Sequence, residues 1–167
     1  PLHGTGITLV PQALAQLGFT NVHVLDDQAT PDGNFPTVLS PNPEEKVAMQ
    51  LALDKARELD ADLVLATDPD ADRVGIAVKD IRGEWVLVNG NQTAALLTHY
   101  LLSARHQAGR LTDRDYIVYT IVTSEVLGDI ARAHKVRSYQ TLTGFKYIAG
   151  IIRELEGEQN YIGGGEE

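Results

Sequence analysis

Short apolar runs and longer stretches with helical periodicity alternate along the chain. The short runs, which predict strands, cover residues 22–25, 63–66, 74–78, 85–88 and 116–122. The longer stretches place apolar residues three or four positions apart and predict helices over residues 9–17, 42–59, 91–107, 124–134 and 145–156. Strands that alternate with helices in this way are typical of βαβ units. We therefore predict an α/β fold with largely parallel or mixed sheets.

Turn and capping residues divide this pattern into two similar halves. The sequence Asn-Pro-Glu-Glu at 42–45 is typical of a helix start, because asparagine caps the first turn and proline suits the first helical position. Arg82-Gly83 predicts a turn, after which the order of strand, loop, helix and strand begins again. We place a domain boundary there and predict two consecutive βαβ-type mixed-sheet domains, both incomplete, at residues 1–84 and 85–167.

Composition and charge narrow the classes of function. The 167 residues include 14 Lys and Arg against 23 Asp and Glu, and the formal net charge of −9 argues against a nucleic-acid partner. The sequence has no cysteine, which excludes disulfides and thiolate metal sites. No apolar run reaches the roughly 18 residues that span a bilayer, so we expect a cytoplasmic protein without a membrane partner. Because the chain starts at Pro1 and stops at Glu167, we expect a fragment of a longer protein.

Three aspartates at alternate positions, Asp68, Asp70 and Asp72, follow the apolar run 63–66. Alternate side chains of an extended segment point the same way, and carboxylates without Cys or His favour Mg²⁺, Mn²⁺ or Ca²⁺. Arg73 follows directly and is suited to anchor a phosphoryl group through two hydrogen bonds. The pattern predicts a metal and phosphoryl site. The alternative is a solvated acidic turn in which Arg73 only balances charge.

Spacing distinguishes this loop from two other acidic motifs. An EF-hand requires glycine at its sixth position and glutamate at its twelfth, where this chain has Arg73 and Lys79. A haloacid-dehalogenase-type phosphatase also has a strand followed by Asp-x-Asp, but it expects Thr or Val at the position of Asp72. That phosphatase and a non-catalytic divalent-cation-binding module remain as the more distant alternatives.

The segment Thr-Asp-Pro-Asp-Ala-Asp-Arg at 67–73 resembles the magnesium loop of the α-D-phosphohexomutases, the phosphoglucomutase/phosphomannomutase superfamily. Other motifs that resemble this family occur in the family's order along the chain. They are Pro-Leu-His-Gly-Thr-Gly at 1–6, Pro-Asp-Gly-Asn-Phe-Pro at 31–36, Pro-Asn-Pro-Glu at 41–44, Asn-Gly-Asn-Gln at 89–92, Thr-Leu-Thr-Gly-Phe-Lys at 141–146 and Gly-Glu-Glu at 165–167. The resemblance covers essentially the whole chain. It implies most of domain II, without its N-terminal strand, and a C-terminally truncated domain III.

The resemblance implies a magnesium-dependent isomerase that interconverts hexose 1-phosphate and hexose 6-phosphate by phosphotransfer. The reaction would use a phosphoserine and a glucose 1,6-bisphosphate-type intermediate. The phosphoserine lies in another domain, so we expect the fragment alone to be inactive. Asp68, Asp70 and Asp72 would hold Mg²⁺, and Arg73 would contact the transferring phosphoryl group. The residues implied in sugar binding are Thr143, Gly144, Lys146, Glu166 and Glu167.

Several interpretations stay open at this level. We favour phosphoglucomutase, with glucose 1- and 6-phosphate as substrates, over the mannose-specific phosphomannomutase and over phosphopentomutase. Lys146 is equally well explained as a solvated lysine at a helix start, and residues 163–165 as a frayed tail. We interpret His3 as a structural loop histidine, and Ser40 as a residue that shapes the turn before a helix.

Overall fold

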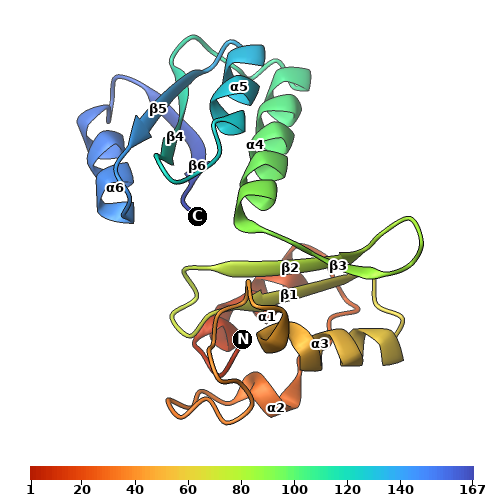
Figure 1. The fold of residues 1–167 in the computed structure, drawn as a ribbon. Coiled ribbons are helices and arrows are strands. Elements are labelled where there is room, and N and C mark those ends of the chain that lie inside the picture. The colour runs from red at the N-terminus through yellow and green to blue at the C-terminus, as the bar shows by residue number, and fades with distance from the viewer. The chain divides into compact units, whose positions relative to one another are not determined.

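Three consecutive strands build the first of two sheets in the computed structural model, which describes residues 1–167 (Figure 1). They pair antiparallel in the order β1-β2-β3. Their bounds are β1 (Leu63–Thr67), β2 (Val74–Lys79) and β3 (Trp85–Val88). The sheet belongs to the first of two compact units, Pro1–Asn89, and the second unit is Gly90–Glu167.

Helix α3 covers one face of the first sheet. The helices of this unit are α1 (Gly6–Gln16), α2 (Asp26–Ala29) and α3 (Lys46–Glu58). Met49 and Leu53 of α3 are fully buried, and they form one hydrophobic core with Val64 and Ala66 of β1. Burying a side chain of this size contributes about 1.5–3 kcal/mol. The opposite face of β1 carries Leu63 and Leu65, which remain about half exposed.

The expected boundary at residue 84 differs from the division in the structure. We expected the strand at 85–88 to open the second half, but it pairs with β2 through contacts such as Ile76 with Val88. The reason is local, since the Asp80 amide donates to the Glu84 carbonyl and Gly83 adopts a φ of +83°. These residues close a hairpin, which makes the neighbouring strands antiparallel. The two compact units therefore divide between residues 89 and 90.

Two local predictions in the first unit are wrong. Residues 22–25 form no strand and pair with none, and Val22 and Val24 stay exposed. Helix α3 begins at Lys46 instead of following Asn42 directly. The Asn42 side chain accepts a hydrogen bond from the Glu44 amide, so this segment forms a turn. Ser40 donates to the Glu45 carboxylate and shapes that turn, as we predicted.

Three parallel strands form the sheet of the second unit, in the order β5-β4-β6. The strands are β4 (Asp115–Thr120), β5 (Arg137–Thr141) and β6 (Asn160–Gly165), and the helices are α4 (Gly90–Gln107), α5 (Val126–Ala133) and α6 (Phe145–Glu154). All six residues of the central strand β4 are buried. The α/β fold class is confirmed, and in this unit the sheet is wholly parallel.

Alternate residues of β4 pack against helices on opposite faces of the sheet (Figure 1). Ile117 and Tyr119 share a core with residues of α4 and α5, whereas Tyr116 and Val118 pack with Ile148 of α6. Side chains of a strand point alternately to its two faces. Because β4 is buried on both faces, it joins the hydrophobic cores on the two sides of the sheet. Its pairing with β5 and β6 fixes the positions at which these two strands end.

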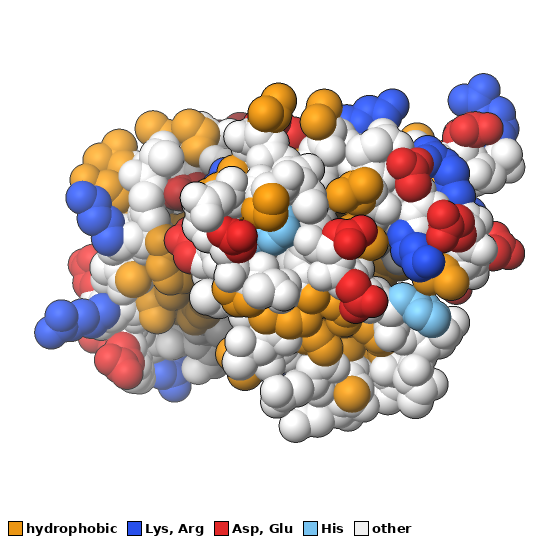
Figure 2. Space-filling view, turned by 90° about the horizontal axis from the view of Figure 1, so that it is seen from below, with side chains coloured by type: hydrophobic (Ala, Val, Ile, Leu, Met, Phe, Trp, Pro, Cys, Tyr) orange, Lys and Arg blue, Asp and Glu red, His pale blue; other side chains and the backbone are white.

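Exposed hydrophobic side chains lie between charged ones on the surface, and Figure 2 shows this mixture on one face of the molecule. In the first unit, exposed apolar residues include Leu9, Leu17 and Phe19. None of the helices combines the length and the hydrophobicity that a membrane-spanning segment requires.

Candidate functional site

The acidic loop connects β1 to β2 as the turn of a hairpin. Thr67 pairs with Val74, so the six intervening residues leave and re-enter the sheet at adjacent positions. Ala71 lies at the tip with a φ of +61°, a backbone conformation that costs a residue with a side chain about 1 kcal/mol. This tight turn brings Asp68, Asp70 and Asp72 together, and one carboxylate oxygen of each lies within 4.8 Å of the others.

Arg73 holds the first aspartate of this loop in place. The Asp68 side chain is 1% exposed, and its two oxygens accept hydrogen bonds from the Arg73 backbone amide at 3.0 Å and from Arg73 Nε at 2.8 Å. Burial by itself would raise the pKa of Asp68, but the hydrogen bonds from Arg73 outweigh burial and lower it. Asp68 is therefore a fixed carboxylate at the base of the loop.

The other carboxylates of the loop face solvent beside Asp68. Asp70 and Asp72 are exposed. A hydrogen bond with Asp68 and the negative charge of Asp68 raise the pKa of the Asp72 carboxyl. The Arg73 side chain is 55% exposed, and its hydrogen bond to the Asp68 side chain uses Nε rather than the terminal nitrogens. The loop thus presents two carboxylates and the free end of a guanidinium to any ligand.

The N-terminal segment contacts the backbone of the acidic loop at Pro69 and supports the loop there. The Thr5 amide donates to the Pro69 carbonyl at 2.8 Å, and the Thr5 hydroxyl donates to the same oxygen at 3.2 Å. Gly4 lies so close that a Cβ atom there would be 2.3 Å from Pro69 Cα. Our sequence analysis quoted residues 1–6 only for their resemblance, and it gave Gly4 and Thr5 no role in the site. The only sequence feature that could have pointed to this support of the acidic loop is the adjacent pair Gly4 and Thr5.

His3 has a structural role in the loops of the first unit, as we predicted. The side chain is 4% exposed, with Nε2 2.8 Å from the Thr37 hydroxyl and Nδ1 3.2 Å from the Thr30 carbonyl. Its backbone amide also donates to the Gln28 carbonyl. His3 therefore ties the N-terminal segment to the loop that follows α2.

The predicted sugar-binding residues lie at the carboxyl end of the second sheet. Parallel sheets place their ligand sites beyond this edge. The Gly144 amide donates to the Glu166 carboxylate, so the loop after β5 and the residues after β6 meet. Gly144 has a φ of +121°, which only glycine adopts readily, and it immediately precedes α6. The residues at 163–165 are strand β6 and not a frayed tail.

The remaining predicted residues of this edge are exposed. Thr143 and Glu167 make no side-chain hydrogen bond, and Lys146 lies in the first turn of α6 with its ammonium 4.8 Å from the centre of the Tyr147 ring. The structure thus places Thr143, Gly144, Lys146 and Glu166 on neighbouring segments, and a hydrogen bond joins Gly144 to Glu166.

Two further residues fix this edge. The Asn91 side chain, at the start of α4, accepts a hydrogen bond from the Ser124 amide in the loop after β4. The Thr123 hydroxyl is 3.4 Å from the Gly165 carbonyl. Our sequence analysis missed both as site residues, although the Asn-Gly-Asn-Gln motif at 89–92 was a signal for Asn91.

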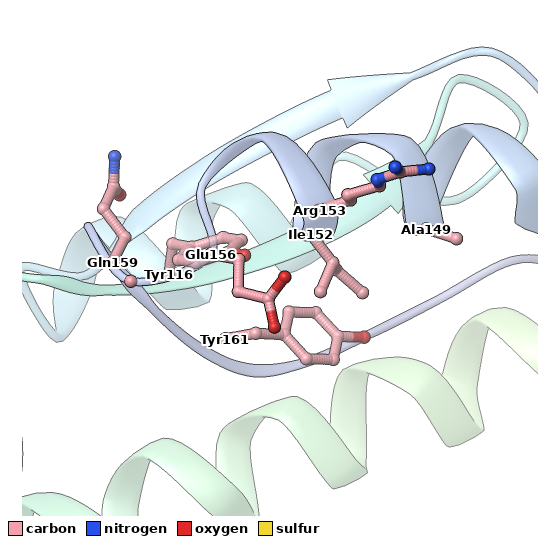
Figure 3. A pocket seen from close by; sticks show the side chains of 8 residues that line it. Tyr116, Ala149, Ile152, Arg153, Glu156, Gln159 and Tyr161 are labelled. Carbon is pink, nitrogen blue, oxygen red and sulfur yellow. The ribbon is translucent and has the colours of Figure 1, made fainter.

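An open pocket of about 390 Å³ lies elsewhere in this unit, beside α6 (Figure 3). Tyr116 and Tyr161 are the second residues of β4 and β6, so the pocket is at the amino end of the strands. Glu156 and Tyr161 are among the residues that line it (Figure 3). The pocket is therefore separate from the edge that carries Gly144 and Glu166.

Solved structures show the same fold. A phosphoglucomutase/phosphomannomutase family protein from Burkholderia thailandensis matches with a TM-score of 0.73 and 23% identity, over 99% of this chain and 32% of that one. A structure from Thermus thermophilus matches with a TM-score of 0.72 and 24% identity, over 99% of this chain and 34% of that one.

Sequence comparisons assign the family. Phosphoglucomutases of Staphylococcus aureus strains N315 and USA300 are 43% and 42% identical over 161 residues, which cover 96% of this chain. The chain spans only 28% of the length of these relatives. Residues 1–83 match the phosphoglucomutase/phosphomannomutase alpha/beta/alpha domain II, and residues 89–167 match alpha/beta/alpha domain III. The chain therefore belongs to the phosphoglucomutase/phosphomannomutase family and comprises regions of its domains II and III.

Proposed function

We propose that the protein containing this chain is a phosphohexomutase that interconverts glucose 1-phosphate and glucose 6-phosphate. The geometry of the acidic loop carries this proposal, because it combines three convergent carboxylates with a half-exposed arginine. The sequence relatives named phosphoglucomutase support the choice of sugar. The first unit would act as domain II and supply the metal site, and the second would act as domain III and supply sugar recognition.

The donor set of the acidic loop fits Mg²⁺. All three candidate ligands, Asp68, Asp70 and Asp72, are carboxylates, which a small hard cation prefers. Oxygens around an octahedral Mg²⁺ lie about 3–4 Å apart, so small rotations of the two exposed side chains would complete the contacts. The narrow space between Gly4 and Pro69 holds the loop backbone in position. A bound Mg²⁺ would neutralise charge on a transferring phosphoryl group.

The chain's own residues would position the phosphoryl group and the sugar. The terminal nitrogens of Arg73 would donate to phosphoryl oxygens while Nε keeps its hydrogen bond to Asp68. A phosphoserine in another domain of the protein would donate and later recover the phosphoryl group, and a hexose bisphosphate would reorient between the two transfers. Positioning and electrostatic stabilisation account for most catalysis of phosphoryl transfer.

The edge formed by Gly144 and Glu166 would bind the sugar. One oxygen of Glu166 accepts from the Gly144 amide, so the second oxygen can accept from a sugar hydroxyl. Thr143 and Lys146 are exposed beside it and would donate to the substrate, and Glu167 would supply a further acceptor. A pyranose has hydroxyl groups on both sides of its ring. Carboxylate acceptors can therefore bind the sugar in either of the two orientations that the reaction requires.

Kinetics of the full-length protein test this proposal. Glucose, mannose and ribose 1-phosphates are assayed separately, with Mg²⁺ and the matching sugar bisphosphate as primer. We expect the highest kcat/KM with glucose 1-phosphate. A higher value with mannose or ribose 1-phosphate would assign the protein to phosphomannomutase or phosphopentomutase, and release of inorganic phosphate without isomerisation would indicate a phosphatase.

A Gly4→Ala substitution is expected to raise the Mg²⁺ concentration that gives half-maximal activity by about tenfold. The added Cβ would meet the Pro69 backbone at 2.3 Å, and backbone atoms cannot move aside as a flexible side chain can. The acidic loop would therefore shift relative to the sheet, and misplaced metal supports commonly cost about 10–100-fold in affinity. The measurement is a Mg²⁺ titration of the full-length enzyme.

The matched control is Gly33→Ala, because a Cβ at Gly33 would have no neighbour within 4 Å. This variant should keep the wild-type Mg²⁺ requirement. An unchanged requirement in Gly4→Ala would show that the N-terminal segment does not position the loop.

A Glu166→Gln substitution is expected to reduce kcat/KM by about tenfold or more, because a hydrogen bond to a charged group contributes about 1.5–3 kcal/mol. Glutamine can still accept from the Gly144 amide, so the loop should stay in place. The Mg²⁺ requirement should not change. The control is Glu158→Gln, since that side chain is exposed and unbonded at the other end of β6. Equal kinetics of the two variants would remove Glu166 from the sugar site.

A further inference from the structure

Three histidines gather on the surface of the second unit, away from the sheet edge that carries Gly144 and Glu166. The ring centre of His134 is 6.0 Å from that of His99 and 5.9 Å from that of His106. His99 and His106 are exposed and lie two turns apart on α4, and His134 caps the C-terminus of α5 between them. Neither the phosphoryl chemistry nor the sugar edge uses these residues.

We propose that His99, His106 and His134 form a binding site for a divalent transition-metal ion of the Zn²⁺ class. Imidazole nitrogens prefer Zn²⁺, Ni²⁺ or Cu²⁺ over Mg²⁺, so the site would not compete for the ion of the acidic loop. Two imidazoles on one tetrahedral Zn²⁺ place their ring centres about 5 Å apart, given Zn–N bonds of about 2.0–2.1 Å. The two pairs that include His134 must each close by about 1 Å, which side-chain rotation of the exposed His99 and His106 allows.

The surroundings of His134 suit a metal ligand. Its Nε2 lies 3.4 Å from the Ser103 hydroxyl, which belongs to α4 between the other two histidines. Ligating histidines commonly use their second nitrogen in such a hydrogen bond, which fixes the ring and leaves the first nitrogen unprotonated. Ser103 would therefore orient the central ligand.

Electrostatics around the cluster also favour a cation. His106 lies in the last turn of α4 and His134 at the C-cap of α5, so two helix C-termini direct their partial negative charge towards it. Of the neighbouring arginines, Arg132 is paired with the Asp129 carboxylate at 2.6 Å.

Calorimetric titration of the full-length protein with Zn²⁺ tests the proposal. Saturating Mg²⁺ keeps the acidic loop occupied, and Co²⁺ titration adds a visible absorption band that reports tetrahedral imidazole coordination. We expect one Zn²⁺ per chain. Binding should disappear in His134→Gln and weaken by about tenfold or more in His99→Gln and His106→Gln. The control His23→Gln removes an exposed histidine of the first unit and should bind as the wild type does.

Four results would overturn the proposal. They are no Zn²⁺ binding by the wild-type protein, undiminished binding in His134→Gln, undiminished binding in His99→Gln or His106→Gln, and loss of the binding in Asp70→Asn instead. Circular dichroism of each variant verifies that the fold is kept, and mutase activity should remain at the wild-type level in all three histidine variants.

Discussion

Replacing Asp70 and Asp72 together with asparagine is expected to reduce the mutase activity of the full-length enzyme by about a hundredfold or more at physiological Mg²⁺. Removing an electrostatic stabiliser from a charged transition state commonly costs this much. The two residues are the exposed carboxylates of the acidic loop. Asp68 is left unchanged because it is buried against Arg73, and its loss would disturb the hairpin itself. The measurement is kcat as a function of Mg²⁺ concentration.

Asp62→Asn is the matched control, since Asp62 is an exposed aspartate just before β1 that makes no contact with the loop. It should show wild-type activity and the wild-type Mg²⁺ requirement. If the double variant kept full turnover in excess chelator, the loop would be a solvated turn, and the magnesium proposal would fail.

Replacing Gly164 with alanine is expected to cost about 4 kcal/mol or more in free energy of unfolding, which is among the largest effects of single substitutions. A Cβ there would lie 1.7 Å from the Val118 carbonyl oxygen and 2.8 Å from its carbon. Both contacts are with the backbone of the central strand, so no side chain can rotate to make room. β6 would have to separate from β4 and break the parallel pairing. Denaturant unfolding monitored by circular dichroism measures the loss.

Gly150→Ala provides a control with the opposite sign. Gly150 lies inside α6, and a Cβ there would have no neighbour within 4 Å. Alanine is favoured over glycine in a helix interior by about 1 kcal/mol, so this variant should be more stable than the wild type. A Gly164→Ala protein within about 1 kcal/mol of the wild type would show that β6 does not pack on β4 as closely as described.

Strongly patterned elements were predictable from the sequence. The apolar runs at 63–66, 74–78 and 85–88 are strands, and the periodic stretches at 91–107 and 145–156 correspond to α4 and α6. Strands β5 and β6 were not predicted. β5 is largely polar, and β6 contains three consecutive glycines, so neither has the apolar pattern of a buried strand. Their pairing comes from contact with β4, which no local pattern reveals.

Strand direction in the first unit also depended on information beyond the hydrophobic pattern. The alternation of strands and helices predicted largely parallel or mixed sheets, but the short turns at 68–73 and 80–84 join consecutive strands of the first unit directly. Turns of this length can connect only antiparallel neighbours. The isolated run at 22–25 has strand-like composition, yet composition alone cannot supply a pairing partner.

The candidate site was partly predictable because its chemistry is local in sequence. Asp68, Asp70 and Asp72 lie within five consecutive positions, and a turn is sufficient to bring them together. The supports of the site were not predictable, because Thr5 reaches Pro69 across 64 residues and Asn91 reaches Ser124 across 33. Such contacts are set by the fold as a whole.

The order of strands in the second sheet determines when each part of the protein can form during synthesis. β1, β2 and β3 are neighbours in sequence, so their hairpins close early over short loops. β4 must wait for β5 and then for β6, the last strand, while both of its apolar faces are only partly covered. The acidic hairpin can therefore form before Glu166 leaves the ribosome. In that interval β4 is the segment most exposed to aggregation and to capture by chaperones.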